Sequence, residues 1–329
     1  MGIQDELDFD SINIKIINVL NTGKISKLYL DNMISIFKMS VRYNLFMINS
    51  FNNKSIFSKK IKIDIKELLE LSKIYLKSIN KEYPFILDEL YRNNSIFFDR
   101  DVSSKSDFDL LKNKYIINIK RDDNYVDVAK VVHEFMHYTN FDKSNTFDNT
   151  RKDLTEYISI YHELKSLAFL FKNRNVLKDK IDFNNRFLST YECSSDVMTY
   201  SYPLIAFCFD KLDENSNEYI SKALKIKLTK ESFNNSALEL SKLLDKGDSS
   251  MIAEYLNDSM NYLLSTYLAF YSYFNHNKSI VNSINHNINR INISSEQLLY
   301  EYNIVLDNEF ENKALNNMKK YVNKYKISD

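Results

Sequence analysis

The chain of 329 residues carries 44 basic and 44 acidic residues, so its formal net charge at pH 7 is zero. This balance argues against a protein that binds nucleic acid through a basic surface. With only three glycines and two prolines, a glycine-rich nucleotide-binding loop is excluded and a turn-rich β-sandwich or barrel is disfavoured. The composition favours a mainly α-helical globular fold.

We expect no segment of the sequence to enter a membrane. The longest apolar run, residues 202–209, is far shorter than the roughly 20 residues that span a bilayer. The N-terminus is acidic and polar, unlike a secretory signal. The two cysteines, Cys193 and Cys208, are too few for a disulfide framework, so we expect reduced thiols. These features predict a cytoplasmic protein.

Residues 1–93 are predicted to form an N-terminal helical lobe. Apolar residues recur with helical periodicity in four stretches, at residues 11–20, 26–49, 64–79 and 84–91. Asp64 is the expected N-cap of the third helix. None of these helices carries chemistry by itself, but together they could form one wall of a cleft.

Strand-like sequence is confined to residues 95–120. Residues 95–99 and 115–119 are rich in β-branched and aromatic side chains, and a polar segment with serines and lysines separates them. We therefore expect a small antiparallel sheet beside the helix that follows. The free edge of such a sheet could hold an extended peptide by main-chain hydrogen bonds.

The helix expected over residues 124–140 carries an H-E-x-x-H motif that begins at His133. Residues i and i+4 share one helix face, so His133 and His137 can direct two imidazole nitrogens at one metal ion. Glu134 can reach a water bound to that ion and act as general base. The chain has only five histidines, so shuffled sequences would show this motif in fewer than ~1% of cases. The alternative is an amphipathic helix whose histidines share a face by chance.

A second helix, expected over residues 153–172, offers a third ligand. Glu156 and Glu163 are seven residues apart and face the same way. Carboxylates on a part-buried face need partners, which a metal ion would supply for Glu156 and the N–H of a ligand histidine for Glu163. We expect one Zn²⁺ per chain, with His133, His137 and Glu156 as ligands. A solvated pair of glutamates is the alternative.

The stretch from His133 to Phe171 reads His-Glu-Phe-x-His and then Glu-x-x-Ser-x-x-x-Glu. It resembles the thimet oligopeptidase and oligoendopeptidase F family of zinc metallopeptidases, which are gluzincins with a nearly all-helical fold and a deep channel for short peptides. The resemblance implies a zincin-like catalytic region over residues 94–329, in a chain shorter than typical members. It implies these roles: zinc ligands His133, His137 and Glu156; general base Glu134; supporting residues Ser159 and Glu163.

Members of that family also carry a tyrosine-rich segment whose hydroxyls stabilise the oxyanion. Residues 265–276 are the similar stretch, and the resemblance implies Tyr267, Tyr271 or Tyr273 in this role. A neutral phenol that donates to a developing oxyanion in a dry site is an effective catalytic device. The alternative is packed tyrosines with solvated hydroxyl groups.

The rest of the C-terminal half is predicted to be helical. The expected helices cover residues 192–212 with an interruption at Pro203, 217–228, 232–244, 251–274, 294–305 and 310–325. Residues 275–289 are rich in asparagine and are expected to form a turn.

These observations predict a zinc-dependent metallopeptidase that hydrolyses peptides or oligopeptides by Glu-assisted attack of a zinc-bound water. Peptides are the expected partners, with no nucleic acid and no membrane. The first alternative is a catalytically weak zincin-fold protein that binds a peptide or protein partner. A helical interaction protein with a chance motif and a hydrolase of esters or non-peptide amides are the others. The sequence gives no oligomeric state.

Overall fold

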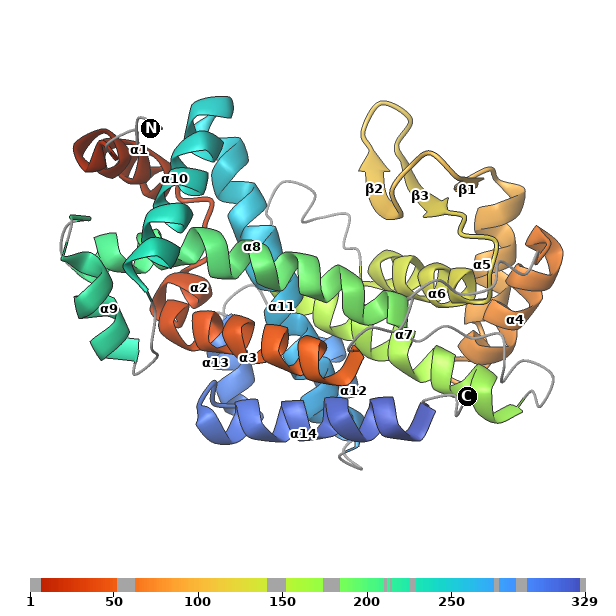
Figure 1. Cartoon of the computed structure of the whole chain (residues 1–329). Coiled ribbons are helices and arrows are strands. Elements are labelled where there is room, and N and C mark those ends of the chain that lie inside the picture. The colour runs from red at the N-terminus through yellow and green to blue at the C-terminus, as the bar shows by residue number, and fades with distance from the viewer. Residues whose placement is uncertain are drawn as a thin grey trace. The chain divides into compact units, whose positions relative to one another are not determined.

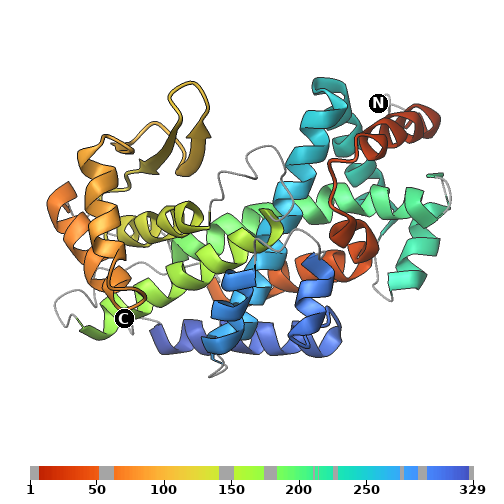
Figure 2. The ribbon, with the colours of Figure 1, turned by 180° about the vertical axis from the view of Figure 1, so that it is seen from behind.

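The computed structural model is mainly helical, with one small three-stranded sheet (Figure 1; Figure 2 shows it from behind). This confirms the expected mainly α-helical class. The structure describes residues 7–51, 63–140, 152–173, 184–209, 212–213, 215–224, 229–274, 278–287 and 295–325. In this part of the chain, no helix is both long enough and apolar enough to span a membrane.

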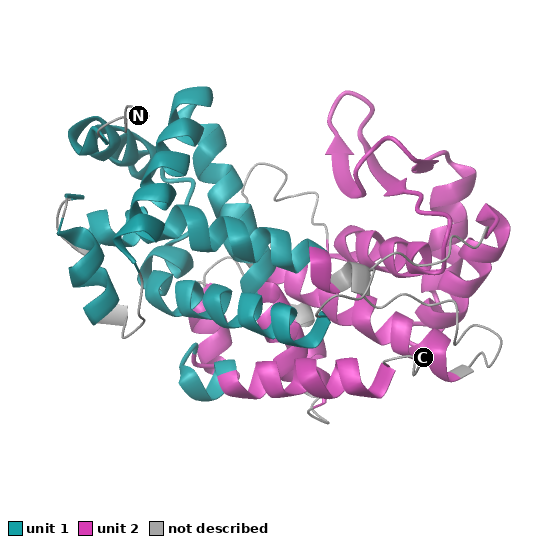
Figure 3. Cartoon of the chain, in the orientation of Figure 1, with its two compact units in different colours: residues 1–52, 189–264, 306–311 teal, residues 53–188, 265–305, 312–329 magenta. Residues whose placement is uncertain are grey.

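The chain divides into two compact units, each built from segments distant in sequence (Figure 3). Unit 1 comprises residues 1–52, 189–264 and 306–311, and unit 2 comprises residues 53–188, 265–305 and 312–329. The two units do not divide at the boundary expected between residues 93 and 94. Residues 53–93 belong to unit 2, together with the H-E-x-x-H helix, because the helices of this region pack on that helix.

Unit 1 begins with three helices rather than the two expected. The helices are α1 (Phe9–Asn21), α2 (Lys27–Asp31) and α3 (Met33–Phe51). The single helix expected over residues 26–49 is broken at Asn32, whose φ of −114° departs from helical geometry. The Leu28 carbonyl accepts from both the backbone amide of Asn32, at 3.2 Å, and its side chain, at 2.9 Å, which closes the end of α2. The other helices that lie wholly in unit 1 are α9 (Ser216–Leu224) and α10 (Lys230–Lys246).

Unit 2 contains the elements that surround the H-E-x-x-H motif. Its helices include α4 (Ile65–Lys77), α5 (Tyr83–Arg92), α6 (Val126–Thr139) and α7 (Lys152–Asn173). Asp64 caps α4 as expected, because its side chain accepts from the Glu67 amide at 2.7 Å. Helix α6 packs against α7, α4 and the sheet.

The sheet differs from the expected antiparallel pair. Its strands are β1 (Ile96–Asp99), β2 (Lys105–Asp109) and β3 (Lys114–Lys120), in the order β1-β3-β2. Strands β1 and β3 pair in parallel, and only β2 and β3 pair antiparallel. The expectation was wrong because the polar segment between the two apolar stretches is itself a strand. It turns back along β3, so β1 and β3 run in the same direction.

Strand β3 shows why the sheet lies against α6. Tyr115, Ile117 and Ile119 alternate with more exposed residues and are buried, as expected for a strand with one face on a core. The register places Ser106 opposite Ile117 and Phe108 opposite Tyr115, on this same face. In Figure 1, β2 and β3 stand over α6.

The remaining helices are α8 (Asn184–Phe209), α11 (Ser249–Tyr273), α12 (Lys278–Asn287), α13 (Ser295–Glu301) and α14 (Asn308–Tyr325). Helix α8 continues through Pro203, so the expected interruption was wrong; buried neighbours such as Tyr202 and Leu204 favour packing that holds the helix together. The turn expected over residues 275–289 was also wrong in its described part. There, Val281 and Ile284 are buried one helical turn apart on α12.

Candidate metal centre

The H-E-x-x-H motif lies on α6, the helix that follows β3 in the chain. Residues 121–125 form the turn between the two elements, and Asp123 adopts a left-handed φ of 54° there. The Asn124 side chain accepts from the Val126 amide at 2.8 Å, and the N-cap itself falls on Tyr125 rather than on Asp123 or Asn124, the two residues that the sequence offers. The helix is buried on most sides, with Val128, Val132, Phe135 and Met136 fully enclosed. The motif therefore lies in a packed core.

His133, His137 and Glu156 converge on one point. The two Nε2 atoms of His133 and His137 are 3.1 Å apart. Glu156 places Oε2 at 3.4 Å from His133 Nε2 and Oε1 at 3.2 Å from His137 Nε2. These three residues form a group whose ligand atoms all lie within 4.8 Å of one another.

The spacing fits a metal ion with tetrahedral ligands. Zinc bonds nitrogen and oxygen at about 2.0–2.1 Å, which sets tetrahedral ligand atoms about 3.3 Å apart. The two Nε2 atoms are 3.1 Å apart, and the Glu156 carboxylate approaches them at 3.2 Å through Oε1 and at 3.4 Å through Oε2, distances near this value. Among the described residues, no donor makes a hydrogen bond to the buried Glu156 Oε2. The donor set of two imidazoles and one carboxylate suits Zn²⁺.

The charges in the cluster favour a positive charge between its three side chains. Burial lowers the pKa of His133, but the adjacent carboxylates of Glu156 and Glu163 outweigh burial and bring the pKa to about 10. Burial raises the pKa of Glu156, but the adjacent imidazoles of His137 and His133 hold it well below its usual range. The geometry thus stabilises either a proton or a metal cation between the three groups.

Glu163 contacts His133 at Nδ1, the ring nitrogen that does not face Glu156 and His137. Its Oε2 lies 3.1 Å from His133 Nδ1, and Glu163 is buried. A proton on Nδ1 that is donated to this carboxylate leaves the lone pair of Nε2 facing Glu156 and His137. The role expected for Glu163 from its sequence spacing therefore has the matching geometry.

Replacing Glu163 with alanine is expected to weaken zinc affinity by about 10–100-fold, because carboxylates that orient ligand histidines contribute on this scale. Glu163→Gln, whose amide oxygen can still accept from Nδ1, is expected to weaken it less. Competition titration against a chromophoric chelator would measure both. Equal zinc affinity in wild type and Glu163→Ala would show that this contact does not orient His133.

Glu134 is buried beside the cluster. Burial raises its pKa, and the charges of His133 and His137 offset part of that shift. The side chain of Ser106 on β2 lies beside the Glu134 carboxylate and the Tyr115 phenol and lowers the pKa of both. A carboxylate whose pKa is moved toward neutrality is suited to general-base chemistry.

Ser106 and Tyr115 are the neighbours of Glu134 that sequence reasoning missed. Ser106 lies in the polar segment that was expected to be a turn, and Tyr115 lies in the strand next to it. Burial and the nearby charge of Glu134 raise the pKa of Tyr115, so the phenol stays neutral and can donate. The alternation of buried and exposed residues along β3 could have placed Tyr115 on the face of the sheet that packs on α6. The pairing of β2 with β3, which places Ser106 on the same face, could not be predicted from the sequence.

Residues 265–273, the last part of α11, contact faces of α7 other than the one that carries Glu156. Ser272 bonds the Tyr157 hydroxyl at 2.7 Å, and the Tyr273 carbonyl accepts from Lys165 at 3.0 Å. At about 100° per residue, Tyr157 and Lys165 lie roughly 100° and 180° around α7 from Glu156.

The three candidate phenols differ in their surroundings. Tyr267 is fully buried, the Tyr271 ring receives the Lys313 ammonium at 4.5 Å, and the Tyr273 hydroxyl pairs with that of Tyr325 at 3.3 Å. The described contacts thus do not bring these tyrosines to Glu156. Ser159 is fully buried one turn after Glu156, and its hydroxyl has no hydrogen-bond partner among the described residues.

Comparison with protein-family models, curated proteins and solved structures found no match to this chain. The fold and the site define a mainly helical protein in which His133, His137 and Glu156 form a group that could hold a metal ion.

Proposed function

We propose that this chain is a zinc-dependent metallopeptidase with a zincin-like, gluzincin arrangement, akin to the oligopeptidases that its motifs resemble. The observation that carries the proposal is the convergence of His133 and His137 on α6 with Glu156 on α7, beside a buried Glu134. A chance motif on α6 gives no reason for a carboxylate of another helix to approach both imidazoles within 3.4 Å.

His133, His137 and Glu156 are the residues that would hold zinc. When bound, zinc supplies Lewis-acid chemistry that polarises a carbonyl and acidifies water. Glu163 keeps the His133 ring in the tautomer that can bind a metal. Three protein ligands are the number that catalytic zinc sites use, in which water or substrate takes the fourth position.

Glu134 acts as the general base. It takes a proton from the attacking water and returns it to the leaving amine. Ser106 lies beside this carboxylate, and burial keeps bulk water from competing. A tyrosine hydroxyl that stabilises the oxyanion remains part of the proposal, with Tyr267, Tyr271 and Tyr273 supported by the resemblance alone.

The sheet supports a peptide as substrate rather than a small ester. In the order β1-β3-β2, strand β2 pairs with β3 on one side only, and Ser106 of β2 touches Glu134. An extended peptide can add to such an edge by main-chain hydrogen bonds. The scissile bond of a peptide on this edge would lie next to the general base.

Cleavage of a random peptide library, followed by mass spectrometry, would test the proposal. We expect the zinc-loaded protein to cleave peptides, a chelator to stop cleavage, and added Zn²⁺ to restore it. Cleavage that persists in chelator would contradict the proposal. Zinc and peptide binding without cleavage would instead support the weakly catalytic, peptide-binding alternative.

A further inference from the structure

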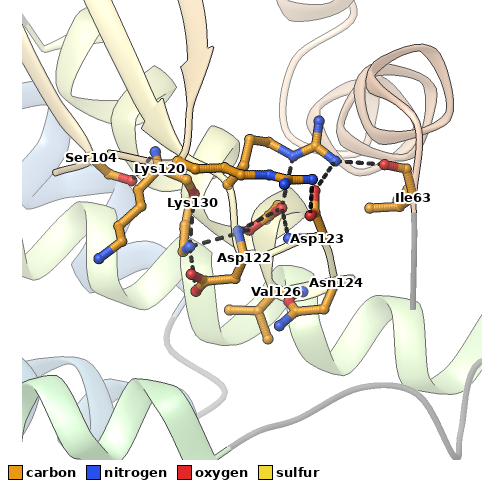
Figure 4. A network of polar contacts seen from close by, with 11 residues as sticks. Ile63, Ser104, Lys120, Asp122, Asp123, Asn124, Val126 and Lys130 are labelled. Atoms are coloured by element: carbon orange, nitrogen blue, oxygen red, sulfur yellow. Dashed lines mark hydrogen bonds and ion pairs between the residues drawn. The ribbon is translucent and has the colours of Figure 1, made fainter. Parts of the chain in front are cut away.

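A buried charged network lies where β3 passes into α6 (Figure 4). Its centre is Asp127, in the first turn of α6, which is fully buried. The Asp127 carboxylate accepts from the backbone amides of Asp122 at 3.0 Å and Asp123 at 3.1 Å. It also accepts from Arg121 Nε at 3.1 Å and Lys130 Nζ at 3.2 Å.

The partners of Asp127 extend the network to neighbouring elements. Arg121 donates to the Ile63 carbonyl just before α4 at 2.6 Å. Lys130 donates to the Lys120 carbonyl at the end of β3 at 2.8 Å and to Asp122 at 2.7 Å. The network therefore joins the start of α4, the end of β3 and the first turns of α6.

Stability alone is a weak reason for such a network. Burying a carboxylate and two cations costs several kcal/mol per ion in desolvation, and an apolar replacement of similar volume is often neutral or stabilising. What the network does specify is the direction in which α6 leaves the turn. Asp127 holds the amides of the turn and the first turn of α6 in one geometry, at the point where Asp123 is left-handed.

The direction of α6 controls the metal ligands. His133 and His137 follow Asp127 by six and ten residues, which is about 9 and 15 Å along the helix axis. A tilt of about 5° at Asp127 would move His137 by about 1.3 Å, whereas metal–ligand distances tolerate about 0.2 Å. Glu156 lies on a separate helix, α7.

We propose that Asp127 is a positioning residue for the metal centre, which fixes the angle of α6 and thereby sets zinc affinity from a distance. This inference rests on the metal centre of the proposed function, but it does not require that the protein cleave peptides. A purely structural Asp127 would affect unfolding and leave the affinity of the folded protein for zinc unchanged.

The test is zinc affinity, measured with Zn²⁺ alone by competition with a chromophoric chelator, at a temperature well below unfolding. Asp127→Asn keeps the shape but places an amide group against donors, and it is expected to weaken zinc affinity by about tenfold, at the lower end of the range for residues that support ligands. The matched control is Asp88→Asn, the same chemical change in the same unit at an acid that contacts Lys73 and lies outside the network. Its zinc affinity is expected to equal that of wild type.

Lys130→Gln is the second variant, in case Asp127→Asn does not fold. Lys130 is partly exposed, and its loss removes one cation from Asp127, so a smaller decrease in the same direction is expected. A lower unfolding temperature with unchanged zinc affinity in the folded variants would overturn the role of Asp127 and leave the metal centre intact. No zinc binding by wild type would overturn both.

Discussion

Glu134→Gln is expected to reduce peptide hydrolysis by about 10²–10⁴-fold, because this is the usual contribution of a positioned general base. Glutamine matches glutamate in size but cannot take a proton from water. Glu134 does not belong to the group of three ligands, so zinc content and affinity are expected to stay at wild-type values. The measurement is kcat/KM on a cleaved library peptide, with zinc content determined on the same samples.

Glu70→Gln is a suitable control for that variant. Glu70 is exposed on α4 in the same unit, and the substitution makes the same chemical change outside the site. Unchanged hydrolysis in Glu134→Gln with zinc bound would contradict the role of Glu134 as base. Loss of zinc from that variant would show instead that Glu134 helps to hold the metal.

Glu156→Ala and His137→Ala are each expected to lower zinc affinity by more than the 10–100-fold typical of residues that only support a ligand. Each substitution removes one corner of the three-ligand group, and a site of two protein ligands falls short of the three that catalytic zinc sites use. Chelator competition and the zinc content of dialysed protein would measure the loss.

Lys172→Ala, an exposed change on the same helix as Glu156, controls for general effects on α7 and is expected to keep zinc. Zinc retained at wild-type affinity in Glu156→Ala would contradict Glu156 as the third ligand. Glu163 would then be the first alternative, since it already lies 3.1 Å from His133 Nδ1.

The parts of the site that follow from local spacing could be predicted from the sequence. His133 and His137 are one helical turn apart, and Glu156 and Glu163 are two turns apart, so each pair shares a helix face wherever its helix lies. The structure brings the two helices together with these faces opposed. The mainly helical fold was predictable for a similar reason, since apolar periodicity and scarce glycine and proline act locally.

The parts that depend on contacts between distant residues could not be predicted. Ser106 reaches Glu134 only because β2 turns back along β3, and a short polar strand has no clear pattern of its own. The Tyr273 segment has a composition similar to a catalytic one, but its place is set by packing against another side of α7. The Asp127 network likewise depends on how the turn before α6 folds back on the helix.

The zinc content of the purified wild-type protein is the most direct test of the central claim, that His133, His137 and Glu156 form a metal site. Elemental analysis after dialysis against trace-metal-free buffer, with one reconstitution in Zn²⁺, would give the stoichiometry. We predict about one zinc ion per chain, as for a single three-ligand site. Protein that binds no zinc even after reconstitution would contradict the claim and leave a helical protein whose histidines and glutamates meet for another reason.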